Sequence, residues 1–511
     1  MYQTALLLLS GPLRFAIESI GPYLKWTNKK VAYRLYIKLE PELYKPFSKS
    51  DTVSLKRLST IVPVLYDKAS SMCKHVDVRI LLGNTEQSKI IRDKPWNFDA
   101  IVTNCESPKD INNYIELYFG KCCGNIIKLN DINNPVHNEE VESTFFDFQT
   151  YKTVCLGGTF DRLHNGHKVL LSESVLKSSE ELIVGITETG GLKKKVLWEL
   201  IESTEKRIED VSEFLREIDP TLHYEVVPIS DIYGPTVTKP DIDCLVVTTE
   251  TKVGGEKVNS ERKNRGMKEL TIHVVDLLIN TEHTQDEEEK LSSSTRRMHL
   301  LGRPLKIVKP SIKPDKSYCV LLRGHPLCGK PLIACKFQDS GIPVLFCDEI
   351  LYAIFKKDSN LQNQVHEKFF GEDSFSFEKL VMFCTKNKEK RDWLAQLVLN
   401  KVKSALRQIF EVYSKQGAHI ILVTDSSLFE GYDLGIEVDE IWAAILPDSE
   451  YIKLFKELYN FTEEEAIEFK PSNVQYVSTA NVIFCNKWSK NTTQKQVNRA
   501  YSYLKSIEKS T

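Results

Sequence analysis

Paired cysteines at the spacing of metal sites or redox motifs are missing from this chain of 511 residues. Its 12 cysteines are scattered, with one adjacent pair, Cys122-Cys123, and no Cys-x-x-Cys. Four of them lie in apolar segments that we predict to be strands: Cys155, Cys244, Cys319 and Cys485. Scattered thiols of this kind favour a reducing compartment and argue against a disulfide framework.

Long apolar runs and an excess of one charge are also missing. Spanning a bilayer takes about 20 apolar residues, whereas the run Leu6–Leu9 is followed at once by Ser-Gly-Pro. Lys and Arg number 68 and Asp and Glu 70, a net charge of -2, so nothing indicates nucleic acid as a partner. We expect a soluble cytoplasmic protein without an integral membrane segment. The basic, acid-poor first 40 residues leave mitochondrial association open.

The length predicts three domains, at about 100–200 residues per domain. Residues 1–148 form an N-terminal α/β region with modest strand signals and no phosphate loop, so its function is not indicated. The polar stretch 135–142 is the expected linker. Residues 149–300 and 312–511 each alternate apolar strands with amphipathic helices, which predicts parallel βαβ units. The fold class is therefore α/β, with two Rossmann-like parallel-sheet domains after the N-terminal region.

One segment carries most of the functional signal. The apolar strand 153–156 leads through a glycine turn to a predicted helix, with His164 and His167 at the helix entrance. Glycines let the backbone approach a ligand, and a helix N-terminus attracts anions. The pattern indicates a nucleotide-phosphate site at the carboxyl end of a strand. The ligand-binding candidates in the turn are Gly157, Gly158, Thr159, Phe160 and Asp161.

A zinc site is one alternative for two histidines at this spacing. Zinc needs a third protein ligand, and no Cys or acidic triad stands at ligand spacing near His164 and His167. Two unrelated surface or capping histidines are the other alternative, against which the preceding Gly-Gly-Thr-Phe-Asp argues. We therefore expect a phosphate site with no protein-bound metal.

Together with the later motifs, this block resembles the phosphopantetheine adenylyltransferases, and most of the chain resembles the animal bifunctional coenzyme A synthases. That family fuses an adenylyltransferase of nucleotidylyltransferase fold to a dephospho-CoA kinase of P-loop fold. The resemblance implies that Thr159 helps to place the phosphate of 4'-phosphopantetheine, while His164 and His167 bind ATP phosphates. The basic residues that it adds to the catalytic set are Lys193, Lys195 and Arg296. Which of the two lysines contacts phosphate stays open.

Three further segments follow in the order that the family keeps. A Tyr-Gly-Pro turn and a Glu-Thr-x-x-Gly-Gly loop come after predicted strand ends, and a serine-rich segment would close over ATP phosphates with its hydroxyls. By composition alone, residues 282–294 are an exposed loop. The substrate-binding residues implied here are Tyr233, Gly234, Glu250, Thr251, Gly254, Gly255, Asn259, Ser292, Ser293, Ser294 and Thr295.

The implied reaction needs no covalent enzyme intermediate. The 4'-phosphate would attack the α-phosphorus of ATP in line and expel pyrophosphate. A phosphate monoester is already anionic near neutral pH, so the protein mainly holds two charged reactants in place, which can supply about 7–11 kcal/mol. Mg²⁺ would accompany ATP, bound mostly by substrate and water. The expected partners are ATP and 4'-phosphopantetheine, and a homo-oligomer stays open.

A second nucleotide-binding motif, at residues 324–331, differs from the family's pattern. Gly324, Gly329 and Lys330 keep the Gly-x4-Gly-Lys frame of a phosphate loop, but Pro331 replaces the Ser or Thr that would bind Mg²⁺. Proline is tolerated in the first turn of a helix, so the fold can persist. The family's Asp-x-Asp after the next strand is reduced to Asp348, which removes the expected general base.

The lid of the kinase-like domain also lacks residues that the family uses for phosphoryl transfer. Leu454 and Leu458 stand where the family has arginines. Arginines that neutralise a transferring phosphoryl group can contribute about 10³–10⁵ to the rate. We therefore predict a degenerate kinase-like domain without dephospho-CoA kinase activity.

Three other functions remain open from the sequence. The chain could keep both activities and phosphorylate dephospho-CoA at the ribose 3'-hydroxyl. It could be a non-catalytic CoA sensor or scaffold, against which the intact adenylyltransferase motifs argue. It could adenylylate another phosphorylated acceptor, against which the Tyr-Gly-Pro and Glu-Thr-x-x-Gly-Gly segments argue. The identity of the product separates these alternatives.

Overall fold

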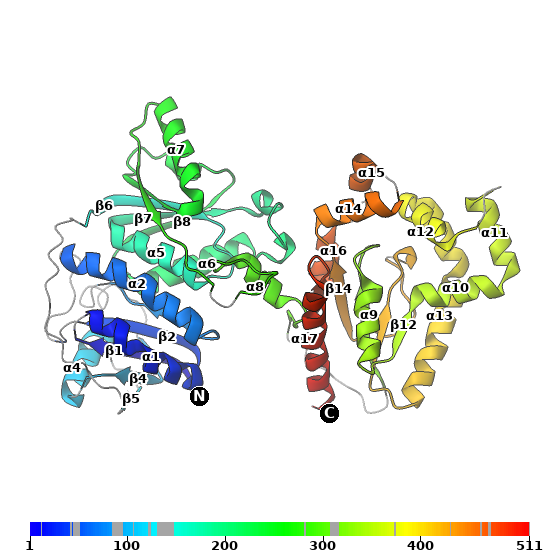
Figure 1. Cartoon of the computed structure of the whole chain (residues 1–511), viewed down its shortest axis with the longest axis horizontal. Coiled ribbons are helices and arrows are strands. Elements are labelled where there is room, and N and C mark those ends of the chain that lie inside the picture. Colours follow the sequence, from blue (N-terminus) through cyan, green and yellow to red (C-terminus); the bar gives the residue numbers. More distant parts are fainter. Residues whose placement is uncertain are drawn as a thin grey trace. The chain divides into compact units, whose positions relative to one another are not determined.

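Three sheets of five parallel strands each form the described part of the chain, with helices between the strands (Figure 1). This confirms the predicted α/β class. The predicted linker 135–142 and the Cys122-Cys123 pair lie outside the described residues. The computed structural model describes residues 1–11, 13–40, 43, 52–83, 96–105, 107–120, 124–129, 148–280, 283–306, 316–371, 375–429, 431–459, 462–468 and 472–509.

The first sheet comes from the region with modest sequence signals. Its strand order is β3-β2-β1-β4-β5. The run Leu6–Leu9 lies in β1, the central strand, and it is apolar throughout because both faces of the sheet are covered. The elements are β1 (Tyr2–Ser10), α1 (Leu13–Lys30), β2 (Val31–Glu40), α2 (Thr52–Met72), β3 (Asp77–Ile80), β4 (Ala100–Thr103), α4 (Pro108–Phe119) and β5 (Asn125–Lys128).

The second sheet contains the predicted phosphate site. Its order is β10-β9-β6-β7-β8. The chain runs outward from β6 through β7 and β8 and then returns to the other side of β6 with β9. The carboxyl ends of β6 and β9 therefore flank the crevice where such sheets bind ligands. The elements are β6 (Tyr151–Gly158), α5 (Asn165–Lys177), β7 (Ser178–Thr187), α6 (Thr204–Ile218), β8 (His223–Ile229), β9 (Cys244–Thr248), α7 (Lys252–Asn264), β10 (Thr271–Val275) and α8 (Ser293–Leu300).

The third sheet has the order β12-β13-β11-β14-β15, and its central strand β11 precedes the phosphate-loop sequence. The predicted strands at 318–322, 420–423 and 441–445 are confirmed. The elements are β11 (Tyr318–Arg323), α9 (Lys330–Asp339), β12 (Val344–Phe346), α10 (Cys347–Lys357), α11 (Ser359–Phe369), α12 (Phe377–Lys386), α13 (Lys388–Lys415), β13 (Ile420–Thr424), β14 (Glu440–Ile445), α14 (Asp448–Tyr459), α15 (Glu463–Glu468), α16 (Asn473–Thr479), β15 (Val482–Cys485) and α17 (Lys490–Glu508).

The chain divides into two compact units, Met1–Lys195 with Ile201–Thr295, and Val196–Leu200 with Arg296–Thr511. In the first unit the first two sheets share one apolar core. Helix α2 joins them, because it packs against both α1 and α5 (Figure 1). The N-terminal region is therefore tied to the second sheet by packing as well as by the chain.

The cysteines and the apolar segments lie in the structure as follows. The four cysteines predicted in strands are buried free thiols. Burial raises the pKa of the thiols, to about 12 for Cys244, Cys319 and Cys485, so they are poor nucleophiles. No helix within the described ranges is long and apolar enough to cross a membrane.

Removing a side chain from the shared core should loosen both of its sheets. Leu65 in α2 is fully buried in that core, so we expect Leu65→Ala to lower the free energy of unfolding by about 2–5 kcal/mol. Native-state hydrogen exchange with mass spectrometry measures this, and the amides of β1 and β6 should lose protection together. Loss of protection in β1 with none in β6 would contradict a shared core.

Candidate active site

A compressed turn joins β6 to α5 at the carboxyl edge of the second sheet. The ring of Phe160 folds back onto Gly158, where a Cβ would lie 2.9 Å from Phe160 Cε2. Phe160 is buried and has a left-handed φ of 49°. At Gly157 a Cβ would meet Ile229 Cδ1 at 3.7 Å, an ordinary contact. Strained backbone of this kind is concentrated at functional sites.

The two predicted histidines lie together at the start of α5. His164 is the N-cap residue, and its Nδ1 accepts a hydrogen bond from the backbone N–H of His167 at 3.4 Å. The two imidazole rings stack with centroids 3.8 Å apart and planes 21° apart. Gly166 makes room for them, because a Cβ there would lie 3.0 Å from His164 Nδ1. The arrangement places two imidazoles beside the backbone N–H groups of a helix N-terminus, an environment suited to a phosphate.

Asp161 connects this turn to two other segments. Its buried carboxylate Oδ1 accepts from the backbone N–H of Glu202 at 3.1 Å. Its carbonyl oxygen accepts from Ser293 Oγ at 2.9 Å. Asp161 thus holds the turn in place through protein contacts, and the serine-rich segment lies directly against the turn.

The serine-rich segment is the beginning of a helix. Ser292 Oγ accepts from the backbone N–H of Thr295 at 3.2 Å, which caps the first turn of α8. Ser293 and Ser294 are half-buried in that turn, and Thr295 is buried. The loop expected for residues 282–294 therefore ends in helical residues, because the hydroxyl of Ser292 satisfies a free N–H of the helix terminus.

Arg207 is a site-forming residue whose role the sequence did not indicate. Its fully buried guanidinium donates to the carbonyl oxygens of Thr159 at 2.8 Å, Thr187 at 2.9 Å and Glu202 at 2.9 Å. These bonds tie the ends of β6 and β7 to the start of α6. Burial lowers the pKa of Arg207. Only the fold shows that this arginine braces backbone, because its partners come from three different segments.

The Tyr-Gly-Pro segment forms a capped turn after β8. Asp231 Oδ1 accepts from the backbone N–H groups of Tyr233 at 2.8 Å and Gly234 at 2.7 Å. Gly234 has a φ of 47°, and a Cβ there would lie 2.6 Å from Ile229 Cγ2, so no other residue fits. An open pocket of about 380 Å³ lies beside this turn and is lined in part by Ile229, Asp231 and Gly234.

The Glu-Thr-x-x-Gly-Gly loop leads from β9 into α7. Thr251 Oγ1 accepts from the backbone N–H of Thr248 at 2.9 Å, and Glu250 pairs with Lys290. The space around Gly254 is open, whereas a Cβ at Gly255 would lie 3.3 Å from Val247 Cγ1.

Asn259, later in α7, makes two hydrogen bonds to the backbone of one residue. Its Nδ2 donates to the carbonyl oxygen of Leu270 at 2.9 Å, and its Oδ1 accepts from the N–H of Leu270 at 2.8 Å. Close packing at Gly255 and this contact hold α7 against β9 and β10. The ligand roles predicted for Asn259 and Gly255 stay predictions.

The predicted basic residues lie on the surface. Lys193 and Lys195 are exposed, and Lys193 follows the short 3-10 helix Thr189–Leu192 after β7. Arg296 is exposed in α8 and is the first residue of the second unit's long segment. Their phosphate-binding roles stay predictions.

The phosphate-loop sequence of the third sheet forms a loop whose lysine is bound internally. Lys330 is buried, donates to the carbonyl oxygen of Gly324 and pairs with Asp425 Oδ1 at 3.2 Å. Although burial alone would lower the pKa of Lys330, the charge of Asp425 raises it above its usual value. Lys330 therefore stays charged while its charge is matched within the protein.

The rest of this loop is crowded. A Cβ at Gly324 would clash with the Ala444 carbonyl, and a Cβ at Gly329 with the Asn486 side chain. Leu327 has a left-handed φ of 66°, a strained conformation for a bulky residue.

Two residues that depart from the kinase pattern lie in the first turns of helices. Pro331 lies in the first turn of α9, where proline is compatible with a helix. Asp348 is exposed in the first turn of α10. The sequence prediction that α9 forms despite Pro331 is confirmed.

Known proteins match this chain chiefly in the region of the second sheet. The cytidylyltransferase-like family matches residues 155–298. The phosphopantetheine adenylyltransferase of Methanothermobacter thermautotrophicus is 37% identical over 128 residues, which are 25% of this chain and 75% of that protein. The chain belongs to the phosphopantetheine adenylyltransferase family. The stacked histidines thus lie within the segment that a nucleotidyltransferase family matches.

Other matches have limited coverage. The phosphopantetheine adenylyltransferase of Saccharomyces cerevisiae is 42% identical over 160 residues, which are 31% of this chain and 52% of the yeast protein. The chain spans about half the length of the yeast relatives that it matches. Among solved structures, a dephospho-CoA kinase from Campylobacter jejuni has a TM-score of 0.28 and 13% identity, covering 36% of this chain and 96% of that one.

Removing the guanidinium of Arg207 should destabilise the site. Arg207→Met leaves buried carbonyl oxygens without their donor, and each such group costs about 1–3 kcal/mol, so we expect a loss of about 3 kcal/mol or more. Urea unfolding measures it. The matched control is Lys206→Met, which removes the adjacent exposed cation and should change stability by at most about 0.5 kcal/mol. Equal effects of the two changes would contradict the bracing role of Arg207.

Proposed function

We propose that this protein transfers the adenylyl group of ATP to 4'-phosphopantetheine, giving dephospho-CoA and pyrophosphate in coenzyme A biosynthesis. One observation carries the proposal: the stacked pair His164 and His167 lies at a helix N-terminus, beside the strand crevice, in a member of the phosphopantetheine adenylyltransferase family. Parallel α/β sheets bind phosphorylated ligands at such a position.

The site favours direct transfer between two bound substrates. An oxygen of the 4'-phosphate bonds to the α-phosphorus of ATP as the bond from that phosphorus to pyrophosphate breaks. Pyrophosphate leaves with the negative charge, which His164, His167 and the α5 N-terminus stabilise. Exposed Lys193 and Lys195 would add positive charge from the surface. The nucleophile is already anionic, so this mechanism includes no general base.

Mg²⁺ enters this proposal as the counter-ion of ATP. The described residues hold no group of three or more His, Cys, Asp or Glu side chains placed to bind a metal. An ion that is bound mostly by substrate oxygens and water fits such a site, and it would offset phosphate charge there. Orientation of the reactants is then the task of the protein's own residues.

We further propose that the kinase-like domain transfers no phosphoryl group. Lys330 is matched by Asp425 and the Gly324 carbonyl, so it offers less attraction to a nucleotide phosphate. Pro331 has no hydroxyl to bind Mg²⁺. Asp348 is the single carboxylate of the former pair and is exposed. These features support a domain that keeps the kinase-like fold without the reaction.

Product analysis tests both parts of this function. Purified protein is given 4'-phosphopantetheine, ATP and Mg²⁺, and the products are identified by mass spectrometry. We expect dephospho-CoA to accumulate with no CoA, because the second site lacks its metal-binding hydroxyl and general base.

Two other results would refute parts of the proposal. The control combines Lys330→Met with Asp425→Asn, so that no buried charge is left unpaired. CoA that forms with the wild-type protein and disappears with this control would show an active kinase domain. Absence of dephospho-CoA would refute adenylyl transfer to 4'-phosphopantetheine.

Gly166→Ala should separate activity from stability. Alanine in a helix is favoured over glycine by about 1 kcal/mol, yet the added Cβ would displace the His164 imidazole. We expect the melting temperature to hold or rise while kcat for dephospho-CoA falls by less than the roughly hundredfold that a 1 Å displacement can cost, because the His164 ring has to move by only a few tenths of an ångström. Gly21→Ala in α1 is the control, since its Cβ would meet only Met72 Cε at 3.9 Å. Unchanged kcat in Gly166→Ala would show that the position of His164 does not matter.

A further inference from the structure

The N-terminal region contacts the histidine motif itself. Asn165, which directly follows His164, donates from Nδ2 to the carbonyl oxygen of Tyr66 at 3.2 Å and to Ser70 Oγ at 2.9 Å. Tyr66 and Ser70 belong to α2. A residue between the two catalytic candidates is therefore held by a helix from outside the adenylyltransferase segment.

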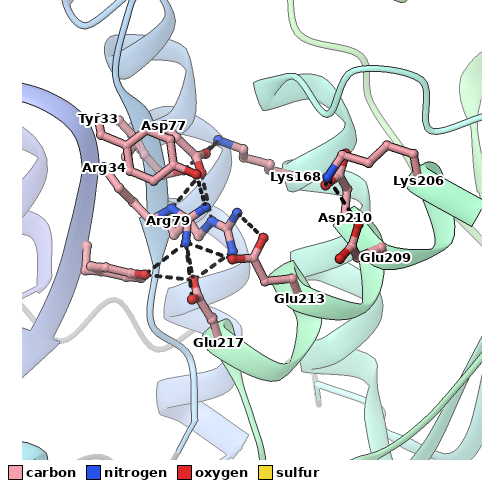
Figure 2. Close-up of polar contacts among 12 residues, drawn as sticks. Tyr33, Arg34, Asp77, Arg79, Lys168, Lys206, Glu209, Asp210, Glu213 and Glu217 are labelled. Carbon is pink, nitrogen blue, oxygen red and sulfur yellow. Dashed lines mark hydrogen bonds and ion pairs between the residues drawn. The ribbon is translucent and has the colours of Figure 1, made fainter. Parts of the chain in front are cut away.

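A second contact follows the other histidine. Lys168, directly after His167, is 4% exposed, and its Nζ contacts Asp77 Oδ1 at 2.5 Å (Figure 2). Its Nζ also donates to the carbonyl oxygen of Val78 at 2.8 Å. Asp77 and Val78 lie in β3 of the N-terminal sheet. A buried lysine with a paired carboxylate is costly to break, so this contact resists displacement of the first turn of α5.

Asp77 is itself held from two sides. Its Oδ2 accepts from Arg34 Nε at 2.9 Å and from Arg79 Nε at 3.0 Å (Figure 2). Burial alone would raise the pKa of Asp77, but the charges of Lys168, Arg79 and Arg34 hold it well below the usual value. The carboxylate therefore remains ionised at any pH at which the enzyme would work.

The same arginines reach the neighbouring helix α6. Arg79 Nη1 pairs with Glu217 Oε2 at 2.7 Å, and Arg34 Nη1 pairs with Glu213 Oε1 at 3.1 Å (Figure 2). These pairs involve the last part of α6, away in sequence from the histidine motif. The interface therefore contains one ion pair that holds α5 and others that hold α6. A variant of an α6 pair can serve as a control for a variant of the α5 pair.

We propose that the N-terminal sheet is a positioning element for the adenylyltransferase site, acting through Asn165 and Lys168 to fix the stacked histidines. Each histidine is followed by a residue anchored on α2 or β3, so the first turn of α5 has two fixed points. This inference rests on the proposed function for its catalytic meaning. It assigns a role to α2 and β3 of the N-terminal sheet, for which the sequence indicated no function.

Kinetics of the full chain test the proposal. In Asn165→Ala the two hydrogen bonds to α2 are lost, and in Lys168→Met the ion pair is lost while Asp77 keeps both arginines. Displacement of reacting groups by about 1 Å can cost 10²-fold, so we expect kcat to fall by about tenfold to a hundredfold. The KM values for ATP and 4'-phosphopantetheine should change much less, because remote substrate contacts are kept.

The matched control is Glu217→Gln, which weakens the same interface on α6. It should lower the melting temperature about as much as Lys168→Met while kcat stays within about twofold, since Asn165 and Lys168 keep their own partners on α2 and β3. Wild-type kcat in both α5 variants, with melting temperatures lowered as in the control, would overturn the proposal by showing a purely structural interface.

Hydrogen exchange separates this inference from the proposed function. Residues 164–172 should exchange faster in Asn165→Ala and Lys168→Met than in Glu217→Gln. If the wild-type protein forms no dephospho-CoA, the proposed function fails, and exchange alone then decides the inference. Unchanged exchange in both α5 variants would overturn it.

Discussion

The carboxylate of Asp77 links the N-terminal sheet to helix α5 of the second sheet. Lys168, Arg34 and Arg79 converge on it from α5, β2 and β3. Burying charges costs solvation, and the attraction between them repays this only when each charge has well-placed partners. Here every one of the three cations contacts the same carboxylate. The network sets the register between the N-terminal sheet and the helix that presents the histidines.

The second and third sheets share one local arrangement but carry different side chains in it. Each has a central strand, a glycine-containing turn and a helix N-terminus, the arrangement that attracts phosphate. In the second sheet Gly166 leaves space for the His164 ring, and two imidazoles occupy the helix start. In the third sheet Lys330 folds back onto Gly324 and Asp425, so the loop satisfies its own charge. The two loops therefore differ in their side chains more than in the order of their backbone elements.

Much of the fold followed from local pattern. Strands covered on both faces are apolar throughout, so β6, β7, β9, β11 and β13 were visible as short apolar runs. The first sheet was harder to predict, because the run in β1 could be assigned to a buried strand only once α1, α2 and α4 were seen to cover it. Arg207 shows the same limit at the site, since its three carbonyl partners are 48, 20 and 5 residues away in sequence.

The sequence by itself determined which residues form the glycine-histidine turn after β6 and that proline follows Lys330 in the loop after β11. Both are properties of a short contiguous segment, where glycine, histidine or proline acts through its own backbone and side chain. Only the tertiary structure decided what fixes those residues in place. The partners of Asn165 and Lys168 come from α2 and β3, about 90 to 100 positions earlier in the chain. Contacts over such separations depend on the packing of whole sheets, and no local pattern encodes them.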